Sequence, residues 1–236
     1  MKFQDTRFWK NYSLYSKQVE QRSMRCSVDA VIYWKLLTYF QFNQILEVGV
    51  FEGLTTGLIL ESNFDCKIIG IDPTNQHSLL YKIYPEAKDQ FTFIKSLSQD
   101  VTLKEQAFDF ILIDGDHDYQ PAKSDVENFL PRLKKSGVLA IDDYQFPGVA
   151  QVLKELHNQK TDWVPFLRSE QTEFWHHRSC ERSEFLDSLL TDPISKFIFI
   201  NNQVDEFNNT VCVAKSVSML TDHLEYFDLA LKQYNT

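Results

Sequence analysis

Short apolar runs of strand length alternate with helix-compatible segments between residues 45 and 159. Apolar runs that are rich in β-branched and aromatic residues are typical of strands buried on both faces of a sheet. We expect strands at residues 45–50, 66–71, 91–94, 108–113 and 137–141, and helices at 53–62, 75–83, 99–106, 120–135 and 148–159. This alternation predicts βαβ units, and hence an α/β fold in which helices cover both faces of a doubly wound, mostly parallel sheet.

The chain before the first strand has another pattern, in which apolar residues recur every three or four positions. This spacing predicts an amphipathic helix from Ser27 to Phe40. Aromatic residues at roughly helical spacing precede it, namely Phe8, Trp9, Tyr12 and Tyr15. We therefore expect residues 1–42 to form an N-terminal helical cap in front of a main domain at residues 43–236.

The alternation of strands and helices ends after Lys160. We expect a strand at residues 163–167, helices at 182–190 and 217–233, and an antiparallel edge hairpin made of 197–200 and 210–214. The stretch 163–196 is longer and more aromatic than an ordinary connection, so we interpret it as a lid or a substrate-side insertion. The aromatic flanks are also a candidate subunit interface, which makes a homodimer a hypothesis.

The composition narrows the class of protein. The chain of 236 residues has 24 basic and 33 acidic residues, a formal net charge of −9 and no basic run, which argues against nucleic acid as a partner. No apolar run reaches about 18 residues and the N-terminus has no signal-peptide pattern, so no membrane partner is expected. Four scattered cysteines favour buried thiols and a reducing, cytoplasmic location.

All seven glycines lie between Gly49 and Gly148, so special backbone geometry is concentrated in one part of the chain. Gly49 and Gly53 lie where the first strand meets the first helix, a place where the backbone can approach a ligand and helix N–H groups are free. Phe51 stands where a G-x-G-x-x-G pattern has its second glycine. The bulk of Phe51 disfavours a dinucleotide and suits a ligand with an amino-acid end.

Acidic residues follow three of the other expected strands. Asp72, before Pro73 at the end of the second strand, is suited to accept both hydroxyls of a ribose, and its alternative role is that of a turn residue. Asp114 follows the fourth strand, and Asp142 and Asp143 follow the fifth. Adjacent parallel strand ends are about 5 Å apart, so these three carboxylates are expected to converge. Oxygen ligands suit Mg²⁺, Ca²⁺ or Mn²⁺, while the alternative for these aspartates is helix capping.

Four motifs in this order resemble one known family: L-E-V-G-x-x-x-G-x-T-T, I-G-I-D-P, I-D-G-D-H-x-Y and G-V-x-A-I-D-D-Y. Over about residues 43–160 the chain resembles class I S-adenosylmethionine-dependent methyltransferases, and within them the small-molecule O-methyltransferase-like subgroup. The resemblance implies a Rossmann-like sheet of seven strands with an antiparallel edge hairpin. It also implies S-adenosyl-L-methionine as the cofactor and a small molecule as the methyl acceptor.

The resemblance assigns roles to single residues. Glu47, Gly49 and Gly53 are implied to line the methionine end of the cofactor, Asp72 to hold the ribose, and Ser96, Leu97 and Ser98 to flank the adenine. Phe51, Thr55, Pro73, Asp114 and His117 complete the predicted cofactor site. In metal-dependent relatives, the positions equivalent to Asp114, Asp142 and Asp143 bind Mg²⁺.

The predicted reaction is the transfer of a methyl group to a hydroxyl, for which an acceptor oxygen must be aligned and deprotonated. His117 is the candidate base, with Asp114 beside it, and its alternative role is to orient a metal-binding aspartate or to pack under the cofactor. His176 and His177 are expected in an exposed loop. Two other classes of protein stay open, a nicotinamide-dependent oxidoreductase and a non-catalytic cofactor-binding or scaffold protein.

Overall fold

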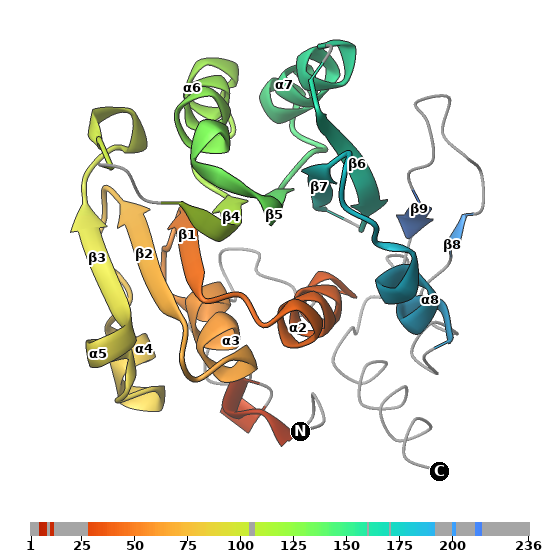
Figure 1. Cartoon of the computed structure of the whole chain (residues 1–236). Coiled ribbons are helices and arrows are strands. Elements are labelled where there is room, and N and C mark those ends of the chain that lie inside the picture. Colours follow the sequence, from red (N-terminus) through yellow and green to blue (C-terminus); the bar gives the residue numbers. More distant parts are fainter. Residues whose placement is uncertain are drawn as a thin grey trace, which may run out of the picture.

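The structure is a computed structural model that describes residues 5–8, 10–11, 28–103, 107–159, 161–169, 171–191, 200–201 and 211–213. The helix expected at 217–233 lies outside these residues, as do Trp9, Tyr12 and Tyr15 of the N-terminal aromatic group. The chain forms one mixed sheet with helices on both sides (Figure 1). No helix among the described residues is both long enough and apolar enough to cross a membrane.

The elements follow one another in the order expected for βαβ units. They are α2 (Val28–Phe40), β1 (Gln44–Val48), α3 (Leu54–Ser62), β2 (Lys67–Asp72), α4 (Ser78–Ile83), α5 (Ala87–Gln90), β3 (Phe91–Lys95), the 3₁₀ turn η2 (Ser98–Asp100), β4 (Phe108–Ile113), α6 (Tyr119–Phe129), the 3₁₀ turn η3 (Leu130–Arg132), β5 (Leu133–Ile141), α7 (Pro147–Asn158), β6 (Trp163–Arg168), β7 (Glu173–His177), α8 (Ser183–Thr191), β8 (Ile200–Asn201) and β9 (Val211–Val213).

The sheet has the strand order β3-β2-β1-β4-β5-β7-β6-β9-β8. Strands β1 to β5 are parallel, and β7 pairs antiparallel with both β5 and β6. These strands form the expected doubly wound, mostly parallel sheet with an antiparallel hairpin. Two short strands extend the sheet beyond β6, and their antiparallel pairing confirms the hairpin expected between 197–200 and 210–214.

The two faces of the sheet pack against different helices. On one face, α2, α3 and α4 bury apolar side chains against β1, β2 and β4, in a core that includes Leu36, Leu58 and Phe110. On the other face, α6 and α7 pack on the same strands, and their core includes Val126 and Leu153. The two sets of helices lie on opposite sides of the sheet in Figure 1.

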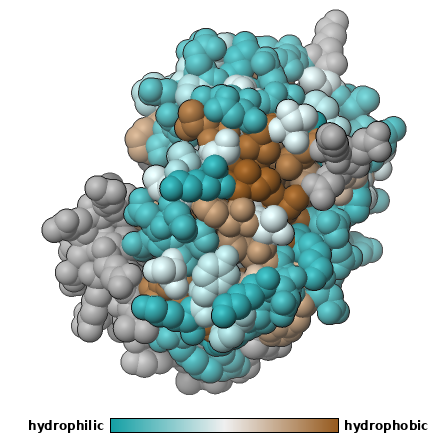
Figure 2. Space-filling view, turned by 90° about the vertical axis from the view of Figure 1, so that its left-hand side faces the viewer, coloured by the Kyte–Doolittle hydropathy of each residue, from teal (hydrophilic) through white to brown (hydrophobic). Residues whose placement is uncertain are grey.

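The free side of strand β3 forms one lateral edge of the described sheet. Its Phe93 and Ile94 are half-buried, in line with a strand that has a neighbour on one side only. Figure 2 views the molecule from this side and shows apolar side chains gathered in the middle of the face, with hydrophilic residues above and below them. Ser96 and Leu97 connect the carboxyl end of β3 to η2.

Three expectations need correction. The helix expected at 120–135 ends at Phe129, because Pro131 removes a backbone donor and β5 already begins at Leu133. In the described part of 99–106 there is only the short turn η2. The first half of 163–196, interpreted above as a lid or insertion, forms strands β6 and β7 inside the sheet, since Phe174 and Trp175 are buried in it.

Candidate active site

The carboxyl ends of four parallel strands lie level with one another. The register pairs Val48 of β1 with Ile71 of β2 and with Ile113 of β4, and it pairs Ile113 with Ile141 of β5. The next residues along the chain therefore form one row: Gly49, Asp72, Asp114 and Asp142. Ligands of open α/β sheets bind at this edge, so the acidic strand ends predicted from the sequence lie at the right place for a site.

The loop between β1 and α3 has an unusual backbone. The angle φ is 88° at Gly49, 47° at Phe51 and 79° at Gly53, all in the left-handed region. At Gly49 a side chain is also sterically excluded, because a Cβ would lie 1.8 Å from the carbonyl oxygen of Asp114. Phe51 carries a side chain, so its left-handed backbone conformation is strained. Backbone strain of this kind is concentrated at functional sites.

The carboxylate of Asp72 holds this loop in place. Its Oδ2 accepts the backbone N–H groups of Val50 at 3.0 Å and of Phe51 at 2.8 Å. Its Oδ1 accepts the N–H of Thr74 at 2.7 Å and the hydroxyl of Thr74 at 2.6 Å. The side chain predicted to hold a ribose thus also fixes the strained backbone in front of it, and it is more than a turn residue before Pro73.

Glu47 lies beneath the loop rather than beside a ligand space. Its side chain is 1% exposed, and its Oε2 accepts the hydroxyl of Thr56 at 2.6 Å. Burial raises the pKa of Glu47 to about 8, and the nearby charge of Asp72 adds to this effect, while the Thr56 hydrogen bond opposes it. Glu47 therefore holds a proton at neutral pH and supports the start of α3 from inside.

A cavity of about 600 Å³ opens in front of the strand ends, and we call it the first cavity. All residues predicted for the cofactor line it except Glu47, which lies beneath the loop, and Gly53, which ends the loop at the start of α3. It also takes in residues that the sequence analysis missed: Thr74, Gln76, Gln99, Asp116 and Pro121. Asp116 stands in the I-D-G-D-H-x-Y motif, whereas the sequence gives no comparable signal for the other four.

Asp114, His117 and Asp143 come together beside the first cavity. One ligand atom from each of them lies within 4.8 Å of the others. His117 Nε2 is 2.9 Å from Asp143 Oδ2, and the imidazole stacks on the ring of Phe146 at 4.4 Å between centroids. Asp143 reaches this position from a left-handed backbone, with φ at 58°.

Asp142 takes another position than the one predicted from the sequence. It was expected to join Asp114 and Asp143, but His117 completes their cluster instead. The Oδ1 of Asp142 accepts the hydroxyl of Thr172 from the loop between β6 and β7. Burial, followed by the charge of Asp29, raises the pKa of Asp142 to about 7.

The site is crowded with acidic groups, which shifts their protonation. Burial raises the pKa of Asp114 well above its ordinary value, and the charges of Asp142, Asp143 and Glu47 raise it further. The hydrogen bond to Asp143 raises the pKa of His117, against the effect of burial. Two carboxylates and an imidazole within reach of one another fit a divalent cation: the carboxylates suit Mg²⁺ or Mn²⁺, and the imidazole suits ions such as Zn²⁺.

A second cavity, of about 350 Å³, adjoins the first, and the two share Thr55, Asp114, His117 and Asp143. Its apolar wall comes from four separate parts of the chain and consists of Phe8, Tyr33, Leu54, Leu58 and Phe146. Asp29 and Asp142 also line it, and the described residues of the lining include no lysine or arginine. The space therefore suits an aromatic or aliphatic body that carries hydroxyl groups at its inner end.

His176 and His177 lie away from both cavities. They belong to strand β7 rather than to the exposed loop that the sequence suggested. Burial lowers the pKa of His176 to about 4, with the charge of Arg182 acting in the same direction, so this imidazole is neutral. Their place directly after Phe174 and Trp175, in a short run rich in ring side chains, was the signal of a strand.

Comparison with known proteins points to one type of domain. Residues 46–144 match the family model described as "Methyltransferase domain", a segment that contains the glycine loop and all the acidic strand ends. An uncharacterized protein of Acanthamoeba polyphaga mimivirus is 25% identical over 112 residues. The match covers 42% of this chain and 51% of the viral protein, so the chain spans about half the length of this relative.

Solved structures of methyltransferases share the fold. The Podospora anserina methyltransferase PaMTH1, bound to SAH, superposes with a TM-score of 0.59 at 15% identity, covering 72% of this chain and 87% of that one. An O-methyltransferase from Bacillus cereus, in complex with SAH, gives 0.56 at 16% identity, covering 72% and 88%. The O-methyltransferase TomG from Streptomyces achromogenes, in complex with SAM, gives 0.53 at 14%, covering 67% and 83%. The chain therefore has the methyltransferase fold, and its residues 46–144 are similar in sequence to a methyltransferase domain.

Proposed function

We propose that the protein is an S-adenosylmethionine-dependent methyltransferase that methylates a hydroxyl of a small molecule with the help of a divalent cation. The observation that carries the proposal is the meeting of two cavities at Asp114, His117 and Asp143. A transferase needs one space for the donor and one for the acceptor, with the reacting groups where they meet. The match of residues 46–144 to a methyltransferase domain also supports this proposed function.

The first cavity is the one we assign to S-adenosylmethionine. Asp72 would hold the ribose hydroxyls, the Gly49–Gly53 loop would face the methionine end, and the segment Ser96–Ser98 would flank the adenine. The bound cofactor supplies a methyl group already activated by a sulfonium. The chain contributes position, because the hydrogen bonds from Val50 and Phe51 to Asp72 keep the loop in one conformation.

His117 and Asp143 handle the acceptor proton in this proposal. If Nε2–H of the neutral imidazole donates to Asp143 Oδ2, then Nδ1 remains free to accept a proton from the acceptor hydroxyl. Phe146 stacks on the imidazole and limits its rotation. The charge of Asp143 stabilises the imidazolium that forms.

Asp114, Asp143 and His117 would hold the cation. A bound divalent ion lowers the pKa of a coordinated hydroxyl and offsets the repulsion between the two carboxylates. A neutral imidazole that donates Nε2–H to Asp143 keeps one lone pair, on Nδ1, which can bind a metal or accept the acceptor's proton but not both. The base and ligand roles of His117 are therefore alternatives. Asp142, tied to Thr172, would instead contact the acceptor from the side of the second cavity.

The experiment is a calorimetric titration of the purified protein with S-adenosylmethionine and with S-adenosylhomocysteine, followed by methyl transfer from labelled cofactor to a panel of phenols and alcohols. We expect Asp72→Asn to weaken binding by more than about tenfold, since it removes charge-assisted hydrogen bonds. Asp65→Asn, an exposed aspartate at the other end of β2, is the matched control and should bind as the unaltered protein does.

Absence of binding by either compound would refute the proposal. NADH serves as a comparison ligand, because binding of NADH in place of S-adenosylmethionine would favour an oxidoreductase. Binding of the cofactor without transfer to any acceptor would favour a non-catalytic protein. Transfer that is unaffected by EDTA would remove the cation from the proposal and leave the rest standing.

A further inference from the structure

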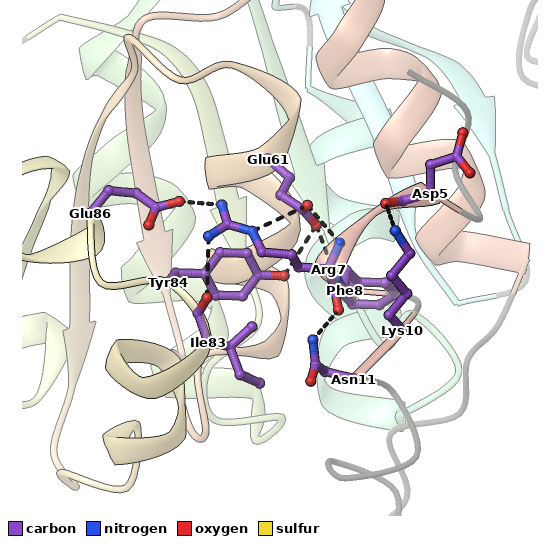
Figure 3. Close-up of polar contacts among 9 residues, drawn as sticks. All are labelled: Asp5, Arg7, Phe8, Lys10, Asn11, Glu61, Ile83, Tyr84 and Glu86. Carbon is purple, nitrogen blue, oxygen red and sulfur yellow. Dashed lines mark hydrogen bonds and ion pairs between the residues drawn. The ribbon is translucent and has the colours of Figure 1, made fainter.

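Residues 5–8 and 10–11 form an N-terminal segment that lies against the C-terminal end of α3 and against α4, although both helices are far away in the sequence (Figure 3). Two of its side chains are deeply buried: Thr6 is 0% exposed and Phe8 is 2% exposed. A helical turn begins here, with the N–H of Lys10 donating to the carbonyl of Thr6 at 3.1 Å. The first N–H groups of such a turn have no partner within the helix and need one from elsewhere.

Glu61 of α3 supplies that partner. Its side chain is 4% exposed, and its Oε1 accepts the backbone N–H of Arg7 at 2.6 Å. Its Oε2 accepts the N–H of Phe8 at 2.8 Å and the hydroxyl of Tyr84 at 3.2 Å. Both oxygens of one buried carboxylate thus hold two consecutive amides of the N-terminal segment.

The side chain of Arg7 makes further contacts around Glu61. It pairs with Glu86, donates to the carbonyl of Ile83 at 3.2 Å and lies 4.6 Å from the centre of the Tyr84 ring. Its Nε is 3.5 Å from Glu61 Oε1, so it also offsets the charge of that carboxylate. We call the set of contacts that Glu61 and Arg7 make the N-terminal clasp.

Helix α3 connects the clasp to the second cavity. Leu54, Leu58 and Glu61 are spaced by four and three positions, so they share one face of the helix. Leu54 and Leu58 line the second cavity, and Phe8 lines it as well. The two amides that Glu61 holds are those of Phe8 and of the residue before it, so the clasp fixes the backbone from which the Phe8 ring enters the cavity wall.

We infer that Phe8 determines which acceptors fit the second cavity, and that Glu61 is the residue that positions Phe8. The inference rests on the proposed function, because it takes the second cavity as the acceptor site. It makes the N-terminal segment a part of the site. Small hydroxylated rings are accepted, and rings with a bulky group toward Phe8 are rejected.

Two measurements test the N-terminal clasp and the wall of the second cavity separately. Hydrogen exchange of the Arg7 and Phe8 amides reports the clasp without any ligand. In Glu61→Gln one oxygen becomes an NH₂ group that faces a donor, so exchange of these amides should accelerate by more than about tenfold. Glu86→Gln, which alters only the half-exposed outer ion pair, and Tyr84→Phe, which leaves both amide acceptors in place, are the matched controls and should change exchange by less than about threefold.

The second measurement is the binding of phenol and of 4-tert-butylphenol in the presence of S-adenosylhomocysteine. The ratio of the two affinities shows how much space the wall of the second cavity leaves for a bulky group. We expect the unaltered protein to prefer phenol, and we expect Phe8→Ala and Glu61→Gln to shift the ratio of the two affinities toward the bulky compound by about tenfold or more. A residue with only a structural role would weaken both phenols alike. Phe8→Leu, which keeps an apolar group at this position, should fold as the parent does and shift the ratio less.

The inference is overturned if the ratio of affinities is unchanged in Phe8→Ala or Phe8→Leu, or if exchange at Arg7 and Phe8 is unchanged in Glu61→Gln. It is also overturned if no phenol binds while S-adenosylhomocysteine does, a result that leaves the assignment of the first cavity intact. Failure of S-adenosylhomocysteine to bind contradicts the proposed function itself, so the two failures are distinguishable.

Discussion

The buried carboxyl of Glu47 should make the protein less stable as the pH rises. Glu47 is 1% exposed, and its pKa is raised from 4.5 to about 8, mainly by burial. Below pH 4.5 the folded and the unfolded chain both hold the proton. Between pH 4.5 and about 8 only the folded chain holds it, so deprotonation favours the unfolded state. The substitution Glu47→Gln keeps the size of the side chain and removes the titration.

The size of the effect follows from the pKa values. A group that is protonated in one state only contributes about 1.4 kcal/mol per pH unit to the free energy of unfolding. Over the interval from 4.5 to about 8 the loss attributable to Glu47 is on the order of 5 kcal/mol. This is comparable with the whole stability of many domains, which is about 5–15 kcal/mol.

The assay is urea unfolding followed by tryptophan fluorescence at several values between about pH 5 and about pH 8. Other acidic groups of the site also titrate, so the quantity of interest is the difference in slope between the parent and Glu47→Gln. Glu127→Gln is the control, because it removes a titrating carboxyl from a side chain that is 65% exposed. We expect the slope of Glu127→Gln to equal that of the parent.

Parallel loss of stability in the parent and in Glu47→Gln would refute the reasoning. It would mean that Glu47 releases its proton at its ordinary pKa in the folded protein. Water would then have to reach the carboxyl beneath the Gly49–Gly53 loop. The parent and Glu47→Gln could also differ in slope by only about half of the expected value. Burial would then still raise the pKa of Glu47, but to a value nearer to about 6.

Three further substitutions test other parts of the structure. Gly49→Ala places a Cβ 1.8 Å from a backbone oxygen and should abolish cofactor binding, as measured by calorimetry, and lower the melting temperature. Asp143→Asn should weaken Mn²⁺ binding by more than about tenfold in an isothermal titration, whereas Asp142→Asn, outside the cluster, should weaken it by less than about threefold. Glu173→Gln, at 0% exposure, removes the buried charge that pairs with Arg168 and should cost about 3 kcal/mol in urea unfolding.

The succession of strands along the chain and the row of strand ends could be predicted from the sequence, because both follow from the alternation of apolar runs and helices. Apolar runs predict buried parallel strands, and parallel strands bring their carboxyl ends to one edge. Asp72 and Asp114 therefore lie where the sequence placed them. The helix was expected to continue through Pro131, but proline interrupts a helix. A helical pattern of apolar residues must therefore be considered together with the prolines inside it.

The composition of the acidic cluster could not be predicted, because it depends on one backbone angle. Asp142 and Asp143 are adjacent in the chain, and the sequence cannot say which of them faces Asp114. The left-handed φ of 58° at Asp143 turns that side chain toward His117, while Asp142 bonds to Thr172. Thr172 lies in a loop that no motif marks.

The second cavity could not be predicted either, because its wall is assembled from distant segments. Tyr33 and Phe146 look like ordinary core residues in the sequence, and no periodicity connects them to Phe8, which stands in the N-terminal aromatic group. Glu61 likewise looks like the polar end of an amphipathic helix. Only the tertiary structure shows that it caps the turn that carries Phe8.

The four hydrogen bonds on Asp72 have a consequence for the energetics of ligand capture. Fixing the backbone of one residue costs roughly 1–2 kcal/mol in conformational entropy. The Gly49–Gly53 loop loses this conformational entropy when the chain folds and not when a ligand binds, since Asp72 already holds Val50 and Phe51 in place. A ligand that enters the first cavity meets a surface that is already shaped, so little of its contact energy is lost to ordering the chain and the heat-capacity change should reflect burial alone.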